Sequence, residues 1–356
     1  MPAPTATMRA AIWREPGLID LSEVELPEVP EGWALIRTAY VGLCGTDLAI
    51  FGGHHPRAAA PLIMGHEFSG TVIQSKSPGI QPADKVMAEP LITCGQCRAC
   101  AEGDSHVCRN LRLYGIDYAG GLAEYVALPG DRLHVLPQDV DLRIAALAEP
   151  LAVAVHANAT VRIGAHDVVA VIGGGPIGLL TALVAQHQGA GRVAIAEPNE
   201  TRRRLAQELG LDAYASVDVL DRHLKQWTDG EGADITFDCA GHPSAAARLP
   251  GLTRGRGTIV LAAVYKHPAE LDLRHINFQE QILRGVRVYT RVDVQRAVGL
   301  ISAGILPLDR LSLQVFGLEE INDAFAAAKN GAEAIKVLVS PSRNSGKHGT
   351  GSQDEW

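Results

Sequence analysis

The chain has 356 residues, and 32 Lys and Arg against 40 Asp and Glu give it a formal net charge of −8. A hydrophobic fraction of 47% and a charged fraction of 20% exclude a disordered chain and are typical of a globular protein, and the length favours two domains. The acidic balance lacks the basic surface that a phosphate backbone requires, so we expect no nucleic-acid partner.

Short strand-like segments separated by Pro and Gly fill the chain from residue 9 to about residue 136, among them residues 70–73, 85–87 and 123–127. Ahead of them, residues 1–7 are rich in Pro, Ala and Thr, and no apolar leader follows. We therefore expect no secretion signal and a cytoplasmic protein.

From residue 168 the pattern changes to strands that alternate with helices. Strand-like residues 168–172, 192–196, 235–239 and 258–264 alternate with helical material that includes residues 177–188 and 200–209. This alternation predicts βαβ units and a parallel sheet. The uncharged run 168–185 contains four glycines and a proline, which favour a buried strand, a turn and a helix over a membrane span, so we expect no membrane partner.

The end of the chain predicts two more helices, a strand and a tail. Helical patterns cover residues 294–303 and 318–329, and a strand pattern covers residues 334–339. Residues 342–356 are rich in Ser, Gly and polar residues, so we expect a disordered tail.

A glycine-rich turn marks a dinucleotide site. Gly173, Gly175 and Gly178 form a G-x-G-x-x-G motif that follows an apolar strand and opens a helix, and Glu197 ends the next strand. Glycines let the pyrophosphate approach the backbone, and the helix N-terminus supplies N–H groups to it. Because Glu197 can accept hydrogen bonds from the adenosine ribose and would repel a 2′-phosphate, we expect NAD. The arginines of residues 202–204 are the counter-indication, although a solvated helix face also explains them.

Four of the six cysteines, Cys94, Cys97, Cys100 and Cys108, lie within 15 residues. Disulfides are one explanation of such spacing, but they do not suit a cytoplasmic chain. We therefore expect a structural zinc with four thiolate ligands and no open position. Cys239 is most simply a small buried apolar residue.

Three further motifs contain metal-ligand side chains. Cys44 lies in a G-x-C-G-T-D motif, His66 and Glu67 in G-H-E, and Glu149 in E-P-L. Alone, each is more often structural than a ligand. Together with the four-cysteine segment and the glycine-rich turn, their order along the chain resembles that of the zinc-dependent medium-chain dehydrogenase/reductase superfamily, in its polyol-type branch of sorbitol, threonine and butanediol dehydrogenases. The resemblance covers about residues 8–340.

The resemblance implies a catalytic zinc held by Cys44, His66 and Glu149. Glu67 is implied to approach the same metal and to exchange with a water. A zinc with three protein ligands and an open position acts as a Lewis acid on an alcohol. The resemblance also makes Asp47 the residue that orients His66, although a turn or cap role competes with this one.

Thr46 is implied to pass the alcohol proton toward the nicotinamide ribose. For the nicotinamide half of the cofactor, the resemblance implies contacts with Ile177, with Arg202 and with the backbone near Val264 and Tyr289.

Two departures from the family pattern concern the substrate pocket. Many relatives have a relay histidine where this chain has Ala49; the nearby His54 and His55 are read as exposed loop residues, and we expect no histidine relay. Sorbitol dehydrogenases have a Tyr and an Arg where this chain has Ile50 and Val288, which argues against sorbitol itself and favours a shorter or less polar secondary alcohol. Arg287 and Arg291 remain available to a substrate.

The implied fold class is α/β, with a GroES-like β-rich catalytic domain and a doubly wound Rossmann domain. We expect the catalytic domain over residues 1–156, completed by residues 288–341, and the NAD-binding domain over residues 157–287. The implied protein is an NAD- and zinc-dependent dehydrogenase of a secondary alcohol, a polyol or vicinal diol, reversible from the ketone, and a homodimer or homotetramer. L-Threonine or a cyclitol as substrate, an NADP-dependent ketone reductase and a catalytically silent zinc- and NAD-binding protein remain as alternatives.

Overall fold

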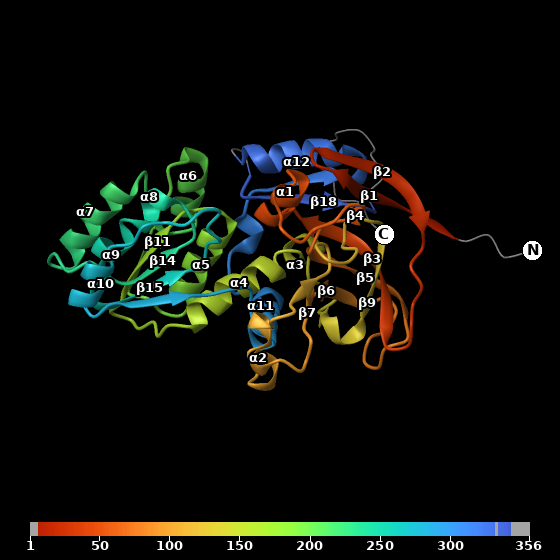
Figure 1. Cartoon of the computed structure of the whole chain (residues 1–356), viewed down its shortest axis with the longest axis horizontal. Helices are drawn as coiled ribbons and strands as arrows, with labels where there is room; N and C mark the ends of the chain where they lie inside the picture. Colours follow the sequence, from red (N-terminus) through yellow and green to blue (C-terminus); the bar gives the residue numbers. More distant parts are fainter. Residues whose placement is uncertain (1–5, 332–333, 343–356) are drawn as a thin grey trace, which may run out of the picture.

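The computed structural model describes residues 6–331 and 334–342 and consists of two lobes that lie side by side (Figure 1). One lobe combines the first part of the chain with its C-terminal helix and strand, and the other is formed by the middle of the chain. The expected disordered tail, apart from its first residue, lies outside the described residues.

The first lobe is built mainly on antiparallel strands. Its largest sheet has the strand order β10-β6-β5-β3-β18-β17, and β9 also pairs with β3. These strands are β3 (Trp33–Gly42), β5 (Glu67–Ser75), β6 (Lys85–Ala88), β9 (Tyr125–Pro129), β10 (Leu133–Leu136), β17 (Leu313–Gly317) and β18 (Lys336–Ser340). Because Val339 of β18 pairs with Val41 of β3, the end of the chain completes a sheet that begins near its start.

Smaller elements complete this lobe. A three-stranded sheet has the order β2-β1-β4, and β7 pairs with β8. The bounds of these strands are β1 (Thr7–Glu15), β2 (Leu18–Glu25), β4 (Leu62–Ile63), β7 (Leu91–Ile92) and β8 (Arg112–Leu113). The helices and 3₁₀ turns are α1 (Gly45–Phe51), α2 (Arg98–Ala101), η1 (Ser105–Val107), η2 (Gly130–Arg132), α3 (Leu142–Ala145), η3 (Leu308–Arg310), η4 (Leu318–Glu320) and α12 (Ile321–Asn330).

The second lobe contains a six-stranded sheet in the order β13-β12-β11-β14-β15-β16, parallel throughout. Its strands are β11 (Val168–Ile172), β12 (Arg192–Ala196), β13 (Asp212–Tyr214), β14 (Ala233–Asp238), β15 (Thr253–Leu261) and β16 (Ile282–Gly285). The strand order reverses between β11 and β14, and ligands of doubly wound sheets bind at the carboxyl ends of the strands beside such a point. The fold class expected from the sequence is confirmed.

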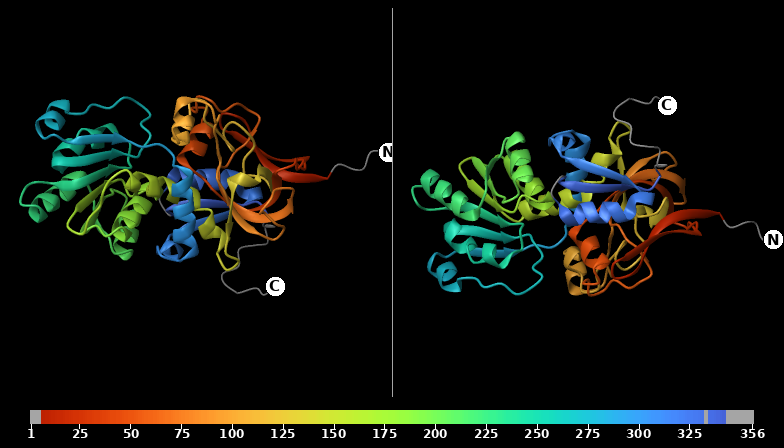
Figure 2. Two further views of the ribbon diagram at one scale, coloured as in Figure 1. Left: turned by 90° about the horizontal axis from the view of Figure 1, so that it is seen from below. Right: turned by 90° about the horizontal axis from the view of Figure 1, so that it is seen from above.

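Helices cover both faces of this sheet and join the lobes (Figure 2). They are α4 (Ala148–Ala159), α5 (Pro176–His187), α6 (Glu200–Glu208), α7 (Val217–Trp227), α8 (Pro243–Ala246), α9 (Leu249–Leu252), α10 (Leu273–Phe278) and α11 (Arg291–Ser302). Helix α4 packs against both α5 and α11 between the two lobes. It is apolar on nearly every side and buried along most of its length, as expected for a helix enclosed by neighbours.

Most predicted elements agree with the structure. Strands β11 and β12 have the expected bounds, and α5 begins at Pro176, where a proline needs no hydrogen-bond partner for a backbone N–H. The prediction that a strand reaches Val264 is wrong. Strand β15 ends at Leu261, and Val264 lies in the following loop with 90% of its surface exposed. No helix in the described part of the chain is long and apolar enough to span a membrane.

Candidate metal and dinucleotide sites

The four cysteines predicted to bind a structural zinc lie close together. Their Sγ atoms lie 3.4 Å (Cys94 to Cys108), 3.5 Å (Cys97 to Cys100) and 3.8 Å (Cys97 to Cys108) apart, and all four are free thiols. A tetrahedral zinc with Zn–S bonds of about 2.3 Å requires sulfur atoms about 3.8 Å apart. Backbone N–H groups of Cys100 and Arg109 lower the pKa of Cys97 to about 6, which favours the thiolate that a metal binds. This donor set fits zinc.

A second cluster consists of Cys44, His66 and Glu67, whose ligand atoms lie within 4.8 Å of one another. The turn from β3 into α1 positions Cys44 as the residue that caps the helix, and His66 immediately precedes β5. Because β3 and β5 pair side by side, with Gly42 opposite Glu67, the two strands bring the ligand side chains together. One soft sulfur, one imidazole and one carboxylate form a donor set that suits zinc.

Asp47 lies between Cys44 and His66 of this cluster. Its Oδ2 accepts a hydrogen bond from the Cys44 backbone N–H at 2.8 Å, and its Oδ1 lies 3.6 Å from Nδ1 of His66. Asp47 therefore has the helix-capping role at the start of α1 that competes with an orienting role. Its distance to His66 is longer than a hydrogen bond. Burial lowers the pKa of His66, but the Asp47 carboxylate outweighs this effect and raises it well above its usual value. With Nδ1 directed at Asp47, Nε2 is the nitrogen left for a metal.

Glu67 has a buried partner that the sequence analysis did not identify. Nζ of Lys336 in β18 lies 2.5 Å from Oε2 of Glu67, and both side chains are almost fully buried. Burial lowers the pKa of Lys336, and the Glu67 carboxylate more than compensates. A Cβ at Gly42 would overlap the Glu67 carboxylate and press on the Lys336 side chain, so a larger residue there would displace the ion pair. A single lysine inside an apolar terminal strand was the available signal.

Glu149 lies beside this cluster rather than within it. The structure groups Glu67, and not Glu149, with Cys44 and His66. Burial, together with the nearby Glu67 carboxylate, raises the pKa of Glu149 to about 7. The hydroxyl of Tyr289 faces Glu149 and is fully buried, and burial and this carboxylate raise the pKa of Tyr289 well above its usual value. Which carboxylate binds a resting metal stays a prediction.

Buried polar atoms without hydrogen-bond partners gather at this point. Among the described residues, Nδ1 of His66 and the hydroxyl of Tyr289 have none, whereas Oε2 of Glu67 has the ion pair with Lys336. Since buried polar groups are nearly always satisfied, these two unpaired atoms fit a site built for a bound group.

The remaining predicted pocket residues differ in exposure. Oγ1 of Thr46 lies 3.8 Å from Sγ of Cys44 and is half-buried next to the cluster. Ile50 is fully buried. His54 is exposed as expected, but His55 is partly buried, and its Nδ1 accepts hydrogen bonds from the backbone of residues 57 and 58. Arg287 and Arg291 are both exposed.

The glycine-rich turn has the close contacts that its motif requires. Gly173 has a φ of +98°, in the left-handed region, and a Cβ at Gly178 would overlap the Gly173 carbonyl oxygen. At Gly175, which caps α5, only the tip of Arg202 comes within 4 Å of a Cβ position, so the space there is open. This open space in front of a helix N-terminus fits a pyrophosphate.

Glu197 lies at the carboxyl end of β12, beside the glycine-rich turn. Its Oε2 accepts a hydrogen bond from the N–H of Gly174 at 2.7 Å, and its Oε1 accepts one from the N–H of Asn199 at 2.7 Å. Each carboxylate oxygen keeps a second lone pair for a ligand hydroxyl. Two further residues are predicted to contact the nicotinamide. Ile177 is half-buried in the first turn of α5, and Val264 lies in the loop after β15.

The arginines that follow Glu197 have partners elsewhere. Arg202 donates to the carbonyl of Gly331 in the other lobe at 2.8 Å, and Arg203 donates to the carbonyls of Glu197 and Pro198. Arg204 forms an exposed ion pair with Glu200. Arg202 therefore joins the two lobes next to Gly175, and its Nε is buried without a partner among the described residues.

Comparisons with known proteins agree with this geometry. Residues 30–138 match the family described as alcohol dehydrogenase GroES-like domain, and residues 176–303 match the family described as zinc-binding dehydrogenase. The chain is 37% identical over 312 residues to 2-dehydro-3-deoxy-L-galactonate 5-dehydrogenase of Pseudoalteromonas atlantica, covering 86% of this chain and 91% of that protein. It is 34% identical to L-threonine 3-dehydrogenase of Bacillus subtilis over 90% of this chain and 94% of that protein.

A solved structure has the same fold. A zinc-binding dehydrogenase of Sinorhizobium meliloti bound to NADP superposes with a TM-score of 0.88 at 32% identity, over 94% of this chain and 100% of that one. The chain thus belongs to the zinc-dependent medium-chain dehydrogenase/reductase superfamily, in its polyol-type branch. It is an oxidoreductase of the zinc alcohol and polyol dehydrogenase type, with a nicotinamide dinucleotide as cofactor.

Proposed function

We propose that this enzyme oxidises a secondary alcohol, a polyol or vicinal diol, to a ketone with NAD, and that it catalyses the reverse reduction. The observation that carries the proposal is the cluster of Cys44, His66 and Glu67 with Thr46 beside it, in a chain whose glycine-rich turn has an acidic residue at the end of the next strand. The proposed catalytic and cofactor-binding domains have the bounds given by the sequence, with joins near residues 156 and 287.

In the proposed mechanism, Cys44 and His66 would hold a catalytic zinc with a carboxylate from Glu67 or Glu149. Bound there, zinc would act as a Lewis acid on a substrate alcohol, and bound NAD would be the hydride acceptor. Thr46 accepts the alcohol proton at its hydroxyl and passes it on toward the cofactor ribose. Asp47 keeps His66 in one orientation. Lys336 neutralises Glu67 whenever that carboxylate is not bound to metal.

The preference for NAD depends on the charge of Glu197. Its carboxylate is held at the ribose end of the predicted site by two backbone N–H groups, so it cannot easily move away from a 2′-phosphate. The three arginines that follow, which could otherwise bind a 2′-phosphate, each have a partner within the protein. Because the solved relative from S. meliloti is bound to NADP, this preference requires a direct test.

The substrate class rests on what the chain lacks. At the positions where sorbitol dehydrogenases have a Tyr and an Arg, this chain has Ile50 and Val288, so polar partners for the distal hydroxyls of a long polyol are missing. The relatives named above act on a deoxy sugar acid and on L-threonine, and these two compounds belong in any substrate panel.

The experiment that tests the proposal is a substrate panel with the zinc-loaded enzyme. Vicinal diols, linear polyols, cyclitols, sugar acids, L-threonine and primary alcohols are each offered with NAD and with NADP, and the absorbance of the reduced cofactor is followed. We expect turnover of one secondary-alcohol class with NAD. Faster turnover with NADP would contradict the cofactor assignment, and binding of zinc and NAD without any turnover would favour a silent binding protein.

A further inference from the structure

Two buried polar residues lie on the same side of α4, the helix that joins the lobes. Glu149 and His156 are seven residues apart, which is about two helical turns. Their side chains therefore project in the same direction, one above the other. Both face the start of α11: Asp293 in its first turn accepts a hydrogen bond from His156, and the buried Tyr289, two residues before the helix, lies near Glu149 without a hydrogen-bond partner for its hydroxyl among the described residues. This arrangement joins α4 to α11 at two levels.

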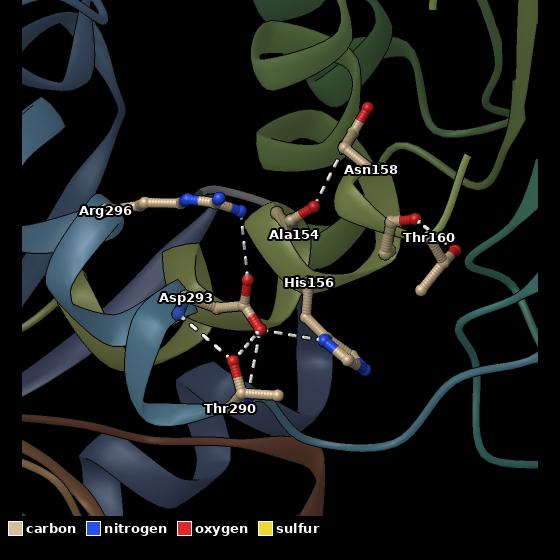
Figure 3. A network of polar contacts seen from close by, with 8 residues as sticks. Ala154, His156, Asn158, Thr160, Thr290, Asp293 and Arg296 are labelled. Carbon is tan, nitrogen blue, oxygen red and sulfur yellow. Dashed lines mark hydrogen bonds and ion pairs between the residues drawn. The ribbon is translucent and has the colours of Figure 1, made fainter. Parts of the chain in front are cut away.

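Asp293 forms the contact with His156 through Oδ2. Its Oδ2 accepts hydrogen bonds from Nδ1 of His156 at 2.9 Å, from the hydroxyl of Thr290 at 2.6 Å and from the backbone N–H of Thr290 at 3.0 Å (Figure 3). Its Oδ1 lies 3.7 Å from the guanidinium of Arg296. The side chains of Asp293 and His156 are 4% and 10% exposed, so water does not compete for these contacts.

The residue before Tyr289 is strained. Val288 has a φ of +42°, in the left-handed region, which a β-branched residue rarely adopts. Such a conformation persists only where the surrounding structure holds it, and it is found most often at functional sites. The Thr290–Asp293 capping box follows directly and is itself bound to His156.

We propose that Asp293 and His156 are positioning residues: they hold the strained turn at Val288 and thereby fix the buried side chain of Tyr289 beside Glu149. The inference rests on the proposed function, since Glu149 and Tyr289 belong to the proposed catalytic site. The ring of His106, in the four-cysteine segment, packs edge-on against the ring of His156 at a centroid distance of 4.9 Å. This contact helps to hold His156 against Asp293.

The kinetic test compares Asp293→Ala with Asp293→Asn. Alanine removes all three hydrogen bonds, whereas asparagine keeps an oxygen that can take the place of Oδ2. We expect Asp293→Ala to lower kcat by about tenfold with little change in KM for NAD, because a small displacement of a catalytic group is costly. We expect Asp293→Asn to keep most of the activity. If Asp293→Ala does not fold, His156→Leu, which keeps the side-chain volume and removes the donor, replaces it.

A spectroscopic test works without any substrate. The protein is labelled with 3-fluorotyrosine, and the resonance of Tyr289 is identified as the one that Tyr289→Phe removes from the seven. We expect Asp293→Ala or His156→Leu to shift or broaden this resonance and to leave the other six in place. An unchanged Tyr289 resonance in either variant would overturn the proposal, even if the melting temperature fell.

Relief of the strain is the sharpest test. Glycine adopts a φ of +42° without cost, so Val288→Gly added to Asp293→Ala is expected to restore the Tyr289 resonance toward its native position and to raise kcat. Arg256→Gly is the matched control, because Arg256 also has a positive φ of 60° but lies in the exposed part of β15. Equal rescue by both glycines, or by neither, would contradict the proposal. Failure of the proposed function alone would abolish turnover in the wild type and leave the fluorine results unaffected.

Discussion

At the residue scale, the chemistry depends on a few carboxylates whose neighbours differ. Glu67 is paired with Lys336, Glu149 faces Tyr289, and Glu197 is held by backbone N–H groups. The three carboxylates differ in the charge and hydrogen-bond donors around them. Substitutions at these three positions should therefore have three different effects.

For Glu197 the expected effect is on cofactor choice. Glu197→Gln removes the charge and keeps an acceptor oxygen, and it should raise kcat/KM for NADP relative to NAD by about 100-fold, since opposed like charges cost several kcal/mol. The control is Glu200→Gln, which removes the same charge from the exposed side of α6. A cofactor ratio that moves equally in both variants would show that overall charge, not Glu197, sets the preference.

For Lys336 the expected effect is on stability. Lys336→Met leaves Glu67 buried without its partner, and breaking a buried ion pair costs about 3–5 kcal/mol of unfolding free energy. Urea unfolding measures this loss, which should be smaller when zinc is present to pair with Glu67. The double variant Lys336→Met/Glu67→Gln removes both charges and should recover most of the loss. A single variant as stable as the wild type would contradict the importance of the pair.

At the scale of elements, the sequence predicts those features whose residues are close together along the chain. The glycine-rich turn, strands β11 and β12 and the four-cysteine segment each follow from a continuous stretch of sequence. The pairing of Glu67 with Lys336 joins strands that lie far apart along the chain, so no local pattern announces it. The contact between His156 and Asp293 was missed for the same reason, and the loop at Val264 was read as strand because an apolar residue there continues the run.

The four-cysteine segment is the element whose metal can be tested alone. Cys97→Ser removes one of four ligands, so we expect the zinc content per chain to fall from two to one, with a lower melting temperature. Because His106 in this segment packs against His156, kcat should fall as well. Cys239→Ser, a substitution of a thiol outside both clusters, should keep two zinc ions. A Cys97→Ser protein that retains two would contradict the structural site.

At the scale of the whole molecule, the exposed edge of the parallel sheet points to self-association. Strand β16 pairs only with β15 among the described strands, and all four of its residues are exposed, including Ile282 and Leu283. An edge strand with one side unpaired among the described strands and with exposed apolar side chains is a surface on which a second copy can continue the sheet. We therefore propose a homo-oligomer through this edge.

Ile282→Lys tests that proposal. Placing a charge on each copy at a shared two-fold interface should lower the mass measured by light scattering to that of the monomer. Ile305→Lys is the control, because Ile305 and Ile282 have nearly equal exposed fractions of 48% and 49% and Ile305 lies after α11, outside the parallel sheet. A monomeric wild type, or dissociation by both substitutions, would contradict the edge as the interface.

The proposed reaction depends on zinc bound by the Cys44 cluster. Cys44→Ser removes the thiolate of that cluster and leaves the four-cysteine segment unchanged. The most direct test is NAD reduction with the preferred alcohol of the panel, measured side by side for zinc-loaded wild type and Cys44→Ser at matched NAD saturation. We expect Cys44→Ser to lower kcat by at least about 1,000-fold, which corresponds to several kcal/mol of the activation barrier, and to keep one zinc bound. Comparable rates in the two proteins would contradict this expectation.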